Sequence, residues 1–388
     1  MTTISIKKLA CVALLLVLPG CHRGGLDRTS GFAYVTNGKS NTVSIIDVGE
    51  FRLVKTLQVG RNPSGIAINP IRKEIYAVNT ESNNVSFIDA ARNEVVATVG
   101  VHRAPYFIDV SSDGHRGYVA NSGSANLSVL DLDKRSVIAN IGVGASPGIA
   151  RVSRDGTTVV VSNRADNTVS VVDARKLAVR ATLPVCEHPE DIAIMPDGGK
   201  AFVACTGSAQ VVAIDLKNDR VLALLDVGKT PINLALKPDG GELFVSNFDA
   251  SSISVIETNA NEVGATYLIG ANPVRAVVSA DNSLLFVSNF GADSISIFSI
   301  NDGKLVASVP VGRRPDALAL TPGEDFLLAA DTQSGDVAVV RLVRLPRGNK
   351  ISLAEAVIKG QNPSKPQALF TMIPVGMQPN AMAVRAAE

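Results

Sequence analysis

The sequence lacks several features on which functional assignments usually rest. It contains no tryptophan, aromatic residues make up only 4% of its 388 residues, and it has only four histidines. It contains no G-x-S-x-G, P-loop or H-E-x-x-H motif, so familiar signatures of esterases, nucleotide-binding proteins and zinc proteases are absent. The formal net charge is only +1, and a protein without a basic field is not expected to bind nucleic acid.

Long hydrophobic runs are also scarce. One run, LACVALLLVL at Leu9–Leu18, is too short to span a bilayer comfortably, and no later apolar run reaches about 18 residues. It follows Lys7 and Lys8 and ends in LPGC, which resembles a bacterial lipobox whose cysteine, here Cys21, becomes the lipid-modified first residue. The alternative is a plain secretory signal with an incidental cysteine.

The lipoprotein interpretation divides the N-terminus into two segments. Residues 1–20 are the predicted signal peptide, and residues 21–30 are the predicted tether, lipidated at Cys21. The residue after the anchor is His22 rather than aspartate, which favours the outer over the inner membrane. We therefore expect a protein on the periplasmic side of a bacterial envelope that touches the membrane only through its lipid.

What the sequence does contain is an internal repeat. The residue that ends each YVTN-like segment recurs at a constant spacing of 42 residues: Asn37, Asn79, Asn121, Asn163, Cys205, Asn247, Asn289 and Asp331. A proline recurs at the same spacing, with one interval lengthened by 22 residues before the last: Pro63, Pro105, Pro147, Pro189, Pro231, Pro273, Pro315 and Pro379. Eight units and this insertion account for residues 31–388, which are predicted to form a single domain.

Each unit contains four short segments of alternating apolar residues, separated by turn sequences such as PDG and SDG. Four strands in a unit of this length are typical of a propeller blade. The segments, such as FAYVTN at Phe32–Asn37, resemble the YVTN-type β-propeller repeat family over all eight units. The predicted fold is all-β: an eight-bladed β-propeller of four-stranded antiparallel blades. The phase makes the C-terminal strand at Ala381–Ala386 the innermost strand that closes blade one.

The insertion falls at about residues 344–367, between the third and fourth strands of blade eight. The segment SLAEAVIKG within it predicts a short helix, because Ser352 and Glu355 form a capping box and Gly360 is a suitable stop. It is interpreted either as a tolerated loop excursion or as a docking element for another envelope protein.

Candidate site residues are sought where the repeats differ, because function is grafted onto a fold. The repeated asparagines and the aspartates that end the third strands are interpreted as structural. Asparagine tolerates left-handed backbone and bonds its own turn, and the aspartates are interpreted as turn caps. The loops around the prolines differ strongly and are expected to share one face of the disc with the loops after the YVTN-like segments. The candidate binding residues there are His102, Arg103, Tyr106, His188, Glu190, Asp191, Asn233, Arg275, Arg313 and Arg314.

Two interpretations stay open for the polar residues on the innermost strands, which are Asp109, Arg151, Asp191, Asn233 and Arg275. They form ion pairs and hydrogen bonds between blades, as buried charge near the axis requires. Alternatively, they form a polar arc at the mouth of the central channel that holds a small anionic or polar ligand, with Arg275 and the loop arginines as anion contacts.

Two cysteines remain once those of the signal peptide and the lipid anchor are set aside. Cys186 and Cys205 are expected on the same face of neighbouring strands, and in an oxidising envelope a disulfide is the favoured prediction. The alternative is a zinc or copper site completed by His188 and a carboxylate such as Glu190. Because only one histidine joins the cysteines and CxxC spacing is absent, no metal is predicted.

Two functional hypotheses follow. The favoured one is a lipoprotein that is not an enzyme and has no cofactor: a platform that binds another envelope protein or a small polar ligand on its loop-rich face. The alternative, by analogy with related propellers, is a periplasmic cofactor-handling or hydrolytic enzyme, haem-related, metal-dependent or lactonase-like. In that case His102 and His188 are the candidate axial or acid–base groups, and Arg275 or Arg313 holds carboxylates.

Overall fold

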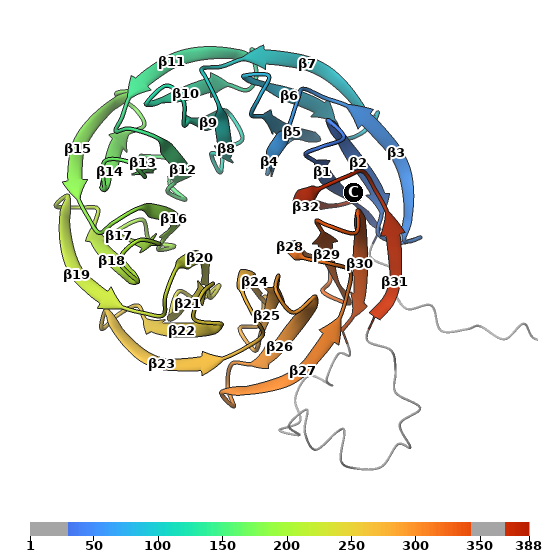
Figure 1. The fold of residues 1–388 in the computed structure, drawn as a ribbon. Helices are drawn as coiled ribbons and strands as arrows, with labels where there is room; N and C mark the ends of the chain where they lie inside the picture. Colours follow the sequence, from blue (N-terminus) through green and yellow to red (C-terminus); the bar gives the residue numbers. More distant parts are fainter. Residues whose placement is uncertain (1–29, 343–368, 388) are drawn as a thin grey trace, which may run out of the picture.

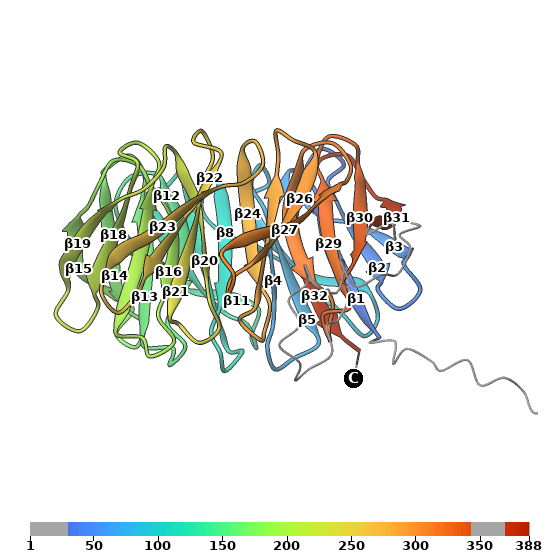
Figure 2. The ribbon, with the colours of Figure 1, turned by 90° about the horizontal axis from the view of Figure 1, so that it is seen from below.

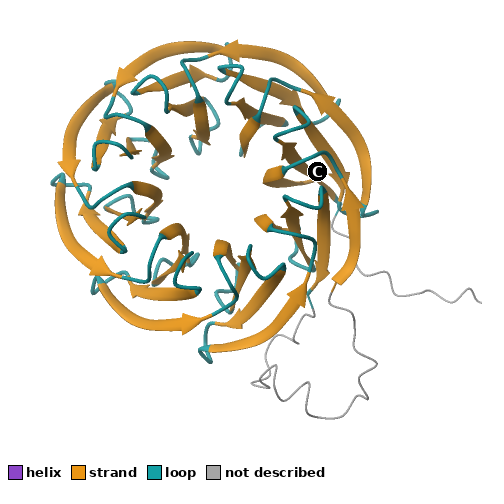
Figure 3. Cartoon of the chain, in the orientation of Figure 1, coloured by secondary structure: helices purple, strands orange, loops and turns teal. Residues whose placement is uncertain are grey.

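A computed structural model describes residues 30–342 and 369–387, which form one ring of strands (Figure 1). Eight antiparallel sheets of four strands each surround a central axis, so the predicted eight-bladed β-propeller is confirmed. The described residues contain no helix (Figure 3), and hence none that is long and apolar enough to cross a membrane. The predicted signal peptide, tether and helix of the insertion lie outside the described residues.

Every blade has the same order of strands from the axis to the rim. The innermost strands begin at the repeated prolines: β4 (Pro63–Ile68), β8 (Pro105–Val110), β12 (Pro147–Val152), β16 (Pro189–Ile194), β20 (Pro231–Leu236), β24 (Pro273–Val278), β28 (Pro315–Leu320) and β32 (Pro379–Ala386). The second strands contain the YVTN-like segments: β1 (Gly31–Asn37), β5 (Glu74–Asn79), β9 (Arg116–Asn121), β13 (Thr158–Asn163), β17 (Lys200–Cys205), β21 (Glu242–Asn247), β25 (Leu284–Asn289) and β29 (Phe326–Asp331).

The two remaining strands of each blade lie toward the rim. The third strands are β2 (Thr42–Asp47), β6 (Asn84–Asp89), β10 (Asn126–Asp131), β14 (Thr168–Asp173), β18 (Gln210–Asp215), β22 (Ser252–Glu257), β26 (Ser294–Ser299) and β30 (Asp336–Arg341). The outer strands are β3 (Arg52–Gln58), β7 (Glu94–Gly100), β11 (Ser136–Gly142), β15 (Ala178–Pro184), β19 (Arg220–Asp226), β23 (Glu262–Leu268), β27 (Lys304–Pro310) and β31 (Leu369–Pro374).

Blade one is built from both ends of the chain. Its innermost strand β32 pairs antiparallel with β1, with Phe32 opposite Arg385 and Thr36 opposite Ala381, and β2 and β3 follow outward. Figure 1 shows the red β32 beside the blue β1. This closure is the predicted one, and it removes the open sheet edges that an unclosed ring would expose.

The core lies between neighbouring blades. The second and third strands are almost completely buried, because both faces of each sheet pack against the next blade. Between blades four and five, for example, Val160 and Val171 pack with Ile192 and Val203. The outer strands alternate between exposed and half-buried residues because their outward side faces solvent. Each blade therefore contributes apolar side chains to two cores at once.

The repeated asparagines are structural, but not through left-handed backbone. Their φ angles are not positive, and the left-handed residues lie four positions later. Each amide instead bonds across its own hairpin, as Asn37 Nδ2 donates to Thr42 Oγ1 at 3.0 Å and to Ser44 Oγ at 2.9 Å. A glycine 19 residues upstream contacts the asparagine side chain closely. For example, a Cβ added to Gly60 would lie only 2.6 Å from the Cβ of Asn79, so this position has no room for a side chain. We call this packing the glycine–asparagine contact.

The aspartates that end the third strands cap turns, as predicted. Oδ1 of Asp47 accepts hydrogen bonds from the backbone N–H groups of Gly49 at 2.8 Å and Glu50 at 3.0 Å. The Asn218 side chain, followed by backbone donors, lowers the pKa of Asp215 to about 2. These caps lie at the face where third strands end. The edge-on view in Figure 2 shows strands of each blade running between the two faces.

Candidate functional site

The candidate residues all lie toward the face where the innermost strands begin, which we term the loop-rich face. Five lie on innermost strands: Tyr106 on β8, Glu190 and Asp191 on β16, Asn233 on β20 and Arg275 on β24. Five lie in the loops that lead into blades three, five and eight, where they are exposed: His102, Arg103, His188, Arg313 and Arg314. The structure joins the first group around the axis and leaves the second group on separate loops.

Asp191 and Asn233 form a chain of hydrogen bonds between three innermost strands. Oδ2 of Asp191 accepts from Asn233 Nδ2 at 2.8 Å and from the backbone N–H of Leu234 at 3.1 Å. Oδ1 of Asn233 in turn accepts from the backbone N–H of Ala276 at 2.9 Å. Both side chains are buried. They therefore link β16, β20 and β24, and they offer little surface to a ligand.

Arg151 extends this network to β12. Its Nη2 lies 3.6 Å from Oδ1 of Asp191, and its guanidinium lies 4.4 Å from the ring centre of Phe107. About a third of the side chain, 33%, is exposed. On β8, Asp109 Oδ2 accepts from the backbone N–H of Val152 at 3.0 Å. Burial raises the pKa of Asp109, and the charge of Arg151 only partly offsets this.

Arg164, which the repeat pattern did not single out, lies in the hairpin that follows β13. Its guanidinium lies 4.4 Å from the ring centre of Tyr106 and forms an ion pair with Glu190. It also passes over Gly148, where a Cβ would lie 2.4 Å from Nε of Arg164. The available signal was this glycine, which occupies the position of Tyr106 and Glu190 in the neighbouring blades.

Arg275 is the most accessible of these three arginines, with 41% of its side chain exposed. Its Nε lies 3.9 Å from Oδ1 of Asp316 on β28. The surrounding protein disfavours the charge, but Asp316, and then Asp191, outweigh this effect and raise the pKa of Arg275. Burial also raises the pKa of Asp316, against the influence of Arg275. We call the whole set the polar arc: Tyr106, Arg151, Arg164, Glu190, Asp191, Asn233, Arg275 and Asp316.

The rest of the axis is lined by small residues. At the second and fourth positions after the proline, blades eight, one and two carry Ala317, Ala319, Ala381, Ala383, Gly65 and Ala67. The innermost strands of all eight blades face one another around the axis (Figure 3). The axis is therefore asymmetric: it is charged along the polar arc, and small across from it, where Ser64 and Asn380 are uncharged polar residues.

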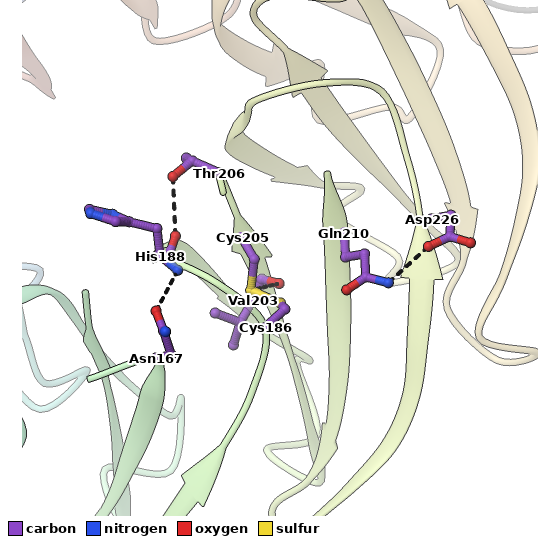
Figure 4. The surroundings of a disulfide bond; sticks show 8 residues. All are labelled: Asn167, Cys186, His188, Val203, Cys205, Thr206, Gln210 and Asp226. Atoms are coloured by element: carbon purple, nitrogen blue, oxygen red, sulfur yellow. Dashed lines mark hydrogen bonds between the residues drawn. A yellow bond between two sulfur atoms is a disulfide. The ribbon is translucent and has the colours of Figure 1, made fainter. Parts of the chain in front are cut away.

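The two loop histidines lie outside this network. His188 has a φ of 57°, and its backbone N–H donates to Asn167 Oδ1 at 2.9 Å. Figure 4 shows its imidazole pointing away from the neighbouring disulfide and from the outer-strand residue Asp226. His102 is also exposed. Among the described residues, no hydrogen bond or ion pair joins either histidine to the polar arc.

Cys186 and Cys205 form a disulfide, with Cα atoms 5.8 Å apart (Figure 4). They occupy the positions of the glycine and the asparagine, so blade five has a covalent bond where most blades have the glycine–asparagine contact. The two sulfurs bond each other, and His188 points away from them, which argues against the alternative zinc or copper site. No group of three His, Cys, Asp or Glu residues within 30–342 and 369–387 could hold a metal ion.

With eight such blades, the chain is a β-propeller repeat protein. Two family models match parts of it. "Lactonase, 7-bladed beta-propeller" matches residues 270–365, and "YNCE-like beta-propeller" matches residues 134–237. Both families are β-propellers, which supports the repeat class that the sequence indicated. No curated protein matches the chain.

Solved structures with a similar fold include proteins named as enzymes. Dihydro-heme d1 dehydrogenase NirN, in complex with DHE, aligns with a TM-score of 0.75 and 16% identity, over 95% of this chain and 78% of that chain. Kuenenia stuttgartiensis hydrazine synthase aligns at 0.58 and 19%, over 69% and 91%. A functionally unknown protein from Desulfotomaculum acetoxidans aligns at 0.58 and 16%, over 92% and 100%. At these identities the likeness shows the fold alone.

These matches overturn the expectation that the chain is not an enzyme. The similar structures include a dehydrogenase and a synthase, and one family model describes lactonases. The expectation rested on the nearly complete structural repeat, the lipid tether and the scarcity of catalytic residues, which includes the absence of a few familiar motifs. A propeller carries its chemistry in residues and cofactors placed on the scaffold, so those absences exclude only the reactions that need the motifs.

Proposed function

We propose that this chain is a propeller enzyme that holds a carboxylate-bearing tetrapyrrole at the polar arc. The observation that carries the proposal is the asymmetry of the axis, with three guanidinium groups on one side and glycine and alanine on the other. A macrocycle with carboxylate arms is complementary to this arrangement, because carboxylates pair with arginine and flat apolar surface packs against small side chains. The similar fold of a dehydrogenase named for dihydro-heme d1 supports the ligand class.

The residues of the arc fit such a ligand. A guanidinium has five N–H donors, and each of the three forms an ion pair with only one described carboxylate, which leaves donors for the ligand. The rings of Tyr106 and Phe107 lie against two of the guanidinium groups and limit their orientation. The exposed imidazoles of His102 and His188 are on the same face and are the residues that would hold an iron. When bound, the tetrapyrrole supplies the redox-active ring system.

The chain's own residues would bind the carboxylate arms and handle protons. Arg275 is the first contact because it is the most exposed arginine of the arc. Burial raises the pKa values of Asp109 and Asp316, so both carboxyls hold a proton more readily than an ordinary aspartate. Asp316 lies beside Arg275, so a proton at its carboxyl would be next to the bound ligand.

Haem binding by the purified full chain tests this proposal, with iron protoporphyrin IX as the probe and its Soret band as the readout. We expect saturable binding. Arg275→Leu should weaken it about tenfold, because a hydrogen bond between charged groups contributes roughly 1.5–3 kcal/mol. His102→Ala or His188→Ala should shift the Soret band where that histidine binds the iron.

The matched controls change the same residue types on the opposite face. Arg92 is 72% exposed there, and the His115 ring pairs with Asp133 at 2.6 Å. Arg92→Leu and His115→Ala should leave haem binding unchanged. Absence of saturable binding, or an equal loss in these controls, would reject the polar arc as the tetrapyrrole site.

Lactone hydrolysis is a second candidate, favoured by the Lactonase model, whose matched residues include Arg275 and Asp316. Asp316 would accept a proton from the attacking water, and Arg275 would bind the carboxylate that forms. A panel of simple lactones, followed by acid release, should show activity that Asp316→Asn lowers by about 10²-fold or more. Asp133→Asn on the opposite face is the control. Hydrolysis no faster than in buffer excludes this candidate.

The enzyme would act on the periplasmic side of the outer membrane, tethered through Cys21. The LPGC sequence supports this placement, although it lies outside the described residues. Cells fed a fatty-acid analogue should label the full chain, and Cys21→Ser should remove the label and release the protein from the membrane fraction. Label retained in Cys21→Ser would contradict the lipid anchor. A second envelope protein would then meet the tethered ring at the loop-rich face.

A further inference from the structure

On the face opposite the loop-rich face, residues of blades six and seven also depart from the repeat. A cavity of about 150 Å³ opens there. Its walls include Glu242 and Glu257 of blade six, the rings of Tyr267 and Phe298, and Gly264 of the outer strand. A cavity of about this volume in another protein takes up benzene, so this one suits a ligand of about six non-hydrogen atoms.

Gly264 helps to form the cavity because it has no side chain. It is the extra residue of a bulge between Ala265 and Val263 in β23. The other seven outer strands have larger residues at the same bulge: Val54, Val96, Ile138, Arg180, Leu222, Val306 and Phe370. A Cβ on Gly264 would lie 3.1 Å from Glu257 Oε1, so that carboxylate lies beside the space a side chain would fill.

Glu257 does not cap a turn with its carboxylate, unlike the aspartates at the same position of five other blades. Aspartates end five other third strands, and their carboxylates accept hydrogen bonds from the following turn. In the described residues, no turn N–H donates to the Glu257 carboxylate, and no cation forms an ion pair with it. Lys237 Nζ instead lies between Glu242 Oε2 at 3.1 Å and Asp239 Oδ2 at 3.5 Å. The Glu257 carboxylate therefore borders the cavity as an exposed group without a described counter-ion.

The register of the sheet adds to this charge. Glu242, Glu257 and Glu262 lie directly opposite one another on β21, β22 and β23. Like charges in directly opposite positions destabilise a sheet. Nothing in the propeller fold requires this row, because the corresponding residues of blade four are Thr158, Asp173 and Ala178. Lys237 offsets part of the repulsion at Glu242, and a positively charged ligand in the cavity would offset the part at Glu257.

The cavity also has an aromatic wall. Tyr267 stands where the other outer strands carry only aliphatic residues: Leu57, Val99, Ile141, Leu183, Leu225, Val309 and Ile373. Its hydroxyl fits over Gly303, where a Cβ would lie 2.8 Å from the oxygen, and its ring centre lies 4.8 Å from that of Phe298. Aromatic faces beside carboxylates attract ammonium groups through both charge and the ring quadrupole.

We infer that this cavity binds a small organic ammonium ion, with Glu257 and Glu242 as charge partners and Tyr267 and Phe298 as the aromatic wall. Three departures from the repeat, at Gly264, Glu257 and Tyr267, converge on it. The site lies on the face opposite the polar arc and does not depend on the proposed function.

Ligand-observed NMR with the full chain tests the inference, with butylammonium as the probe and butanol and butyrate as the neutral and anionic analogues. We expect saturable binding of butylammonium only. Gly264→Val, which restores the residue common at this bulge, should fill the cavity and lower the affinity at least about tenfold while the protein stays folded. Glu257→Gln should lower it by a similar factor, because a charge-assisted bond is lost.

Val96→Ala is the matched control, because it changes the same bulge position in blade two, away from the cavity. It should leave butylammonium binding unchanged. Three results would each overturn the inference: no binding of butylammonium to the unaltered chain, equal binding of butanol, or full affinity in Gly264→Val. A melting temperature that is not lowered in Glu257→Gln shows that its loss of binding does not come from unfolding.

Discussion

Blades five and eight depart from the other six at the same position and in opposite directions. Six blades have an asparagine there, whose amide donates to the next strand, as Asn163 Nδ2 does to Ser170 Oγ at 2.9 Å. Blade five has Cys205, covalently joined to Cys186. Blade eight has Asp331, whose carboxyl has no N–H to donate. At this position the second strand of each blade is held to the loop that enters the blade. The disulfide strengthens this contact, whereas the buried carboxyl weakens it.

The neighbouring residues change with these substitutions. The six asparagines donate to a serine seven residues later, and that serine is replaced by Val212 in blade five and by Ala338 in blade eight. Neither a disulfide sulfur nor a carboxylate has an amide proton to give to such an acceptor. The exchange of one residue therefore altered a local network rather than a single contact.

The largest effect is expected from Cys205→Ala. The disulfide joins residues separated by 19 positions, and closing a loop of that length stabilises a protein by about 3 kcal/mol. Cys205→Ala should lower the free energy of unfolding by that amount, measured by denaturant unfolding under oxidising conditions. Reduction of the unaltered protein should give the same loss. Unfolding at an unchanged midpoint would show that the covalent link adds nothing to the fold.

The triple variant Cys186→Gly, Cys205→Asn and Val212→Ser sharpens the comparison, because it installs the network of the regular blades. The amide of the asparagine at position 205 would donate to the serine at position 212, and the glycine at position 186 would leave room for its side chain. We expect the triple variant to be more stable than Cys205→Ala by about 1–2 kcal/mol, since a buried hydrogen bond and a close contact are restored. Equal unfolding midpoints for the two variants would mean that blade five cannot adopt the regular contact.

Gly270→Ala tests the contact in a regular blade. A Cβ there would lie 2.2 Å from Cγ of Asn289, so one of the two segments must move. The free energy of unfolding should fall by about 1–3 kcal/mol, as for other overpacked sites. Gly142→Ala is the control, because no atom lies within 4 Å of its added Cβ, and a change there should stay within about 0.5 kcal/mol.

Asp331→Asn should stabilise the protein in a pH-dependent manner. Burial, together with the hydrogen bond and charge of Asp336, raises the pKa of Asp331 to about 8, while Gly312 N–H donates to its Oδ2 at 3.0 Å. The folded state therefore binds a proton that the unfolded state releases near pH 4, so stability falls as the pH rises from about 4 to about 8. Asparagine removes this titration and can donate to Asp336.

Thermal unfolding across the pH range measures this effect. The gain in Asp331→Asn should be small near pH 4 and reach about 1–3 kcal/mol above pH 8, the usual range for an unsatisfied buried polar group. Asn247→Asp, which places a carboxyl at the same position of a regular blade, should destabilise increasingly over the same range. A gain in Asp331→Asn that does not depend on pH would exclude the raised pKa of Asp331 as its cause.

The fold could be predicted because the repeat is so regular. The 42-residue spacing counted the blades, and the alternating segments marked the four strands of each. The position of the repeat within the chain also placed the C-terminal strand beside β1. The asparagines were rightly predicted to be structural and to bond their own turns, as Asn37 does, but the expected left-handed backbone was wrong. Their contact with the upstream glycine was not predicted, because a turn preference is local whereas the contact of Asn79 with Gly60 joins a strand to the loop that enters its blade.

The site was only partly predictable. The repeat pattern drew attention to Asp191, Asn233 and Arg275, and the structure does join them around the axis. It did not identify Arg164, because that arginine lies in a variable hairpin and the one available signal was Gly148, on another strand. It also selected His188, whose side chain no described hydrogen bond or ion pair joins to the arc.

The sequence by itself determined the architecture of this protein, because the number of blades and their closure follow from a period in one chain. The tertiary structure decided which of the residues that differ from the repeat lie in contact with one another. Residues of adjacent blades come together, as Arg164 of blade four does with Tyr106 of blade three and Glu190 of blade five. A missing side chain at Gly264 becomes part of a cavity only because blade seven supplies Phe298 opposite it. These meetings depend on side-chain direction in a closed ring, which spacing alone does not encode.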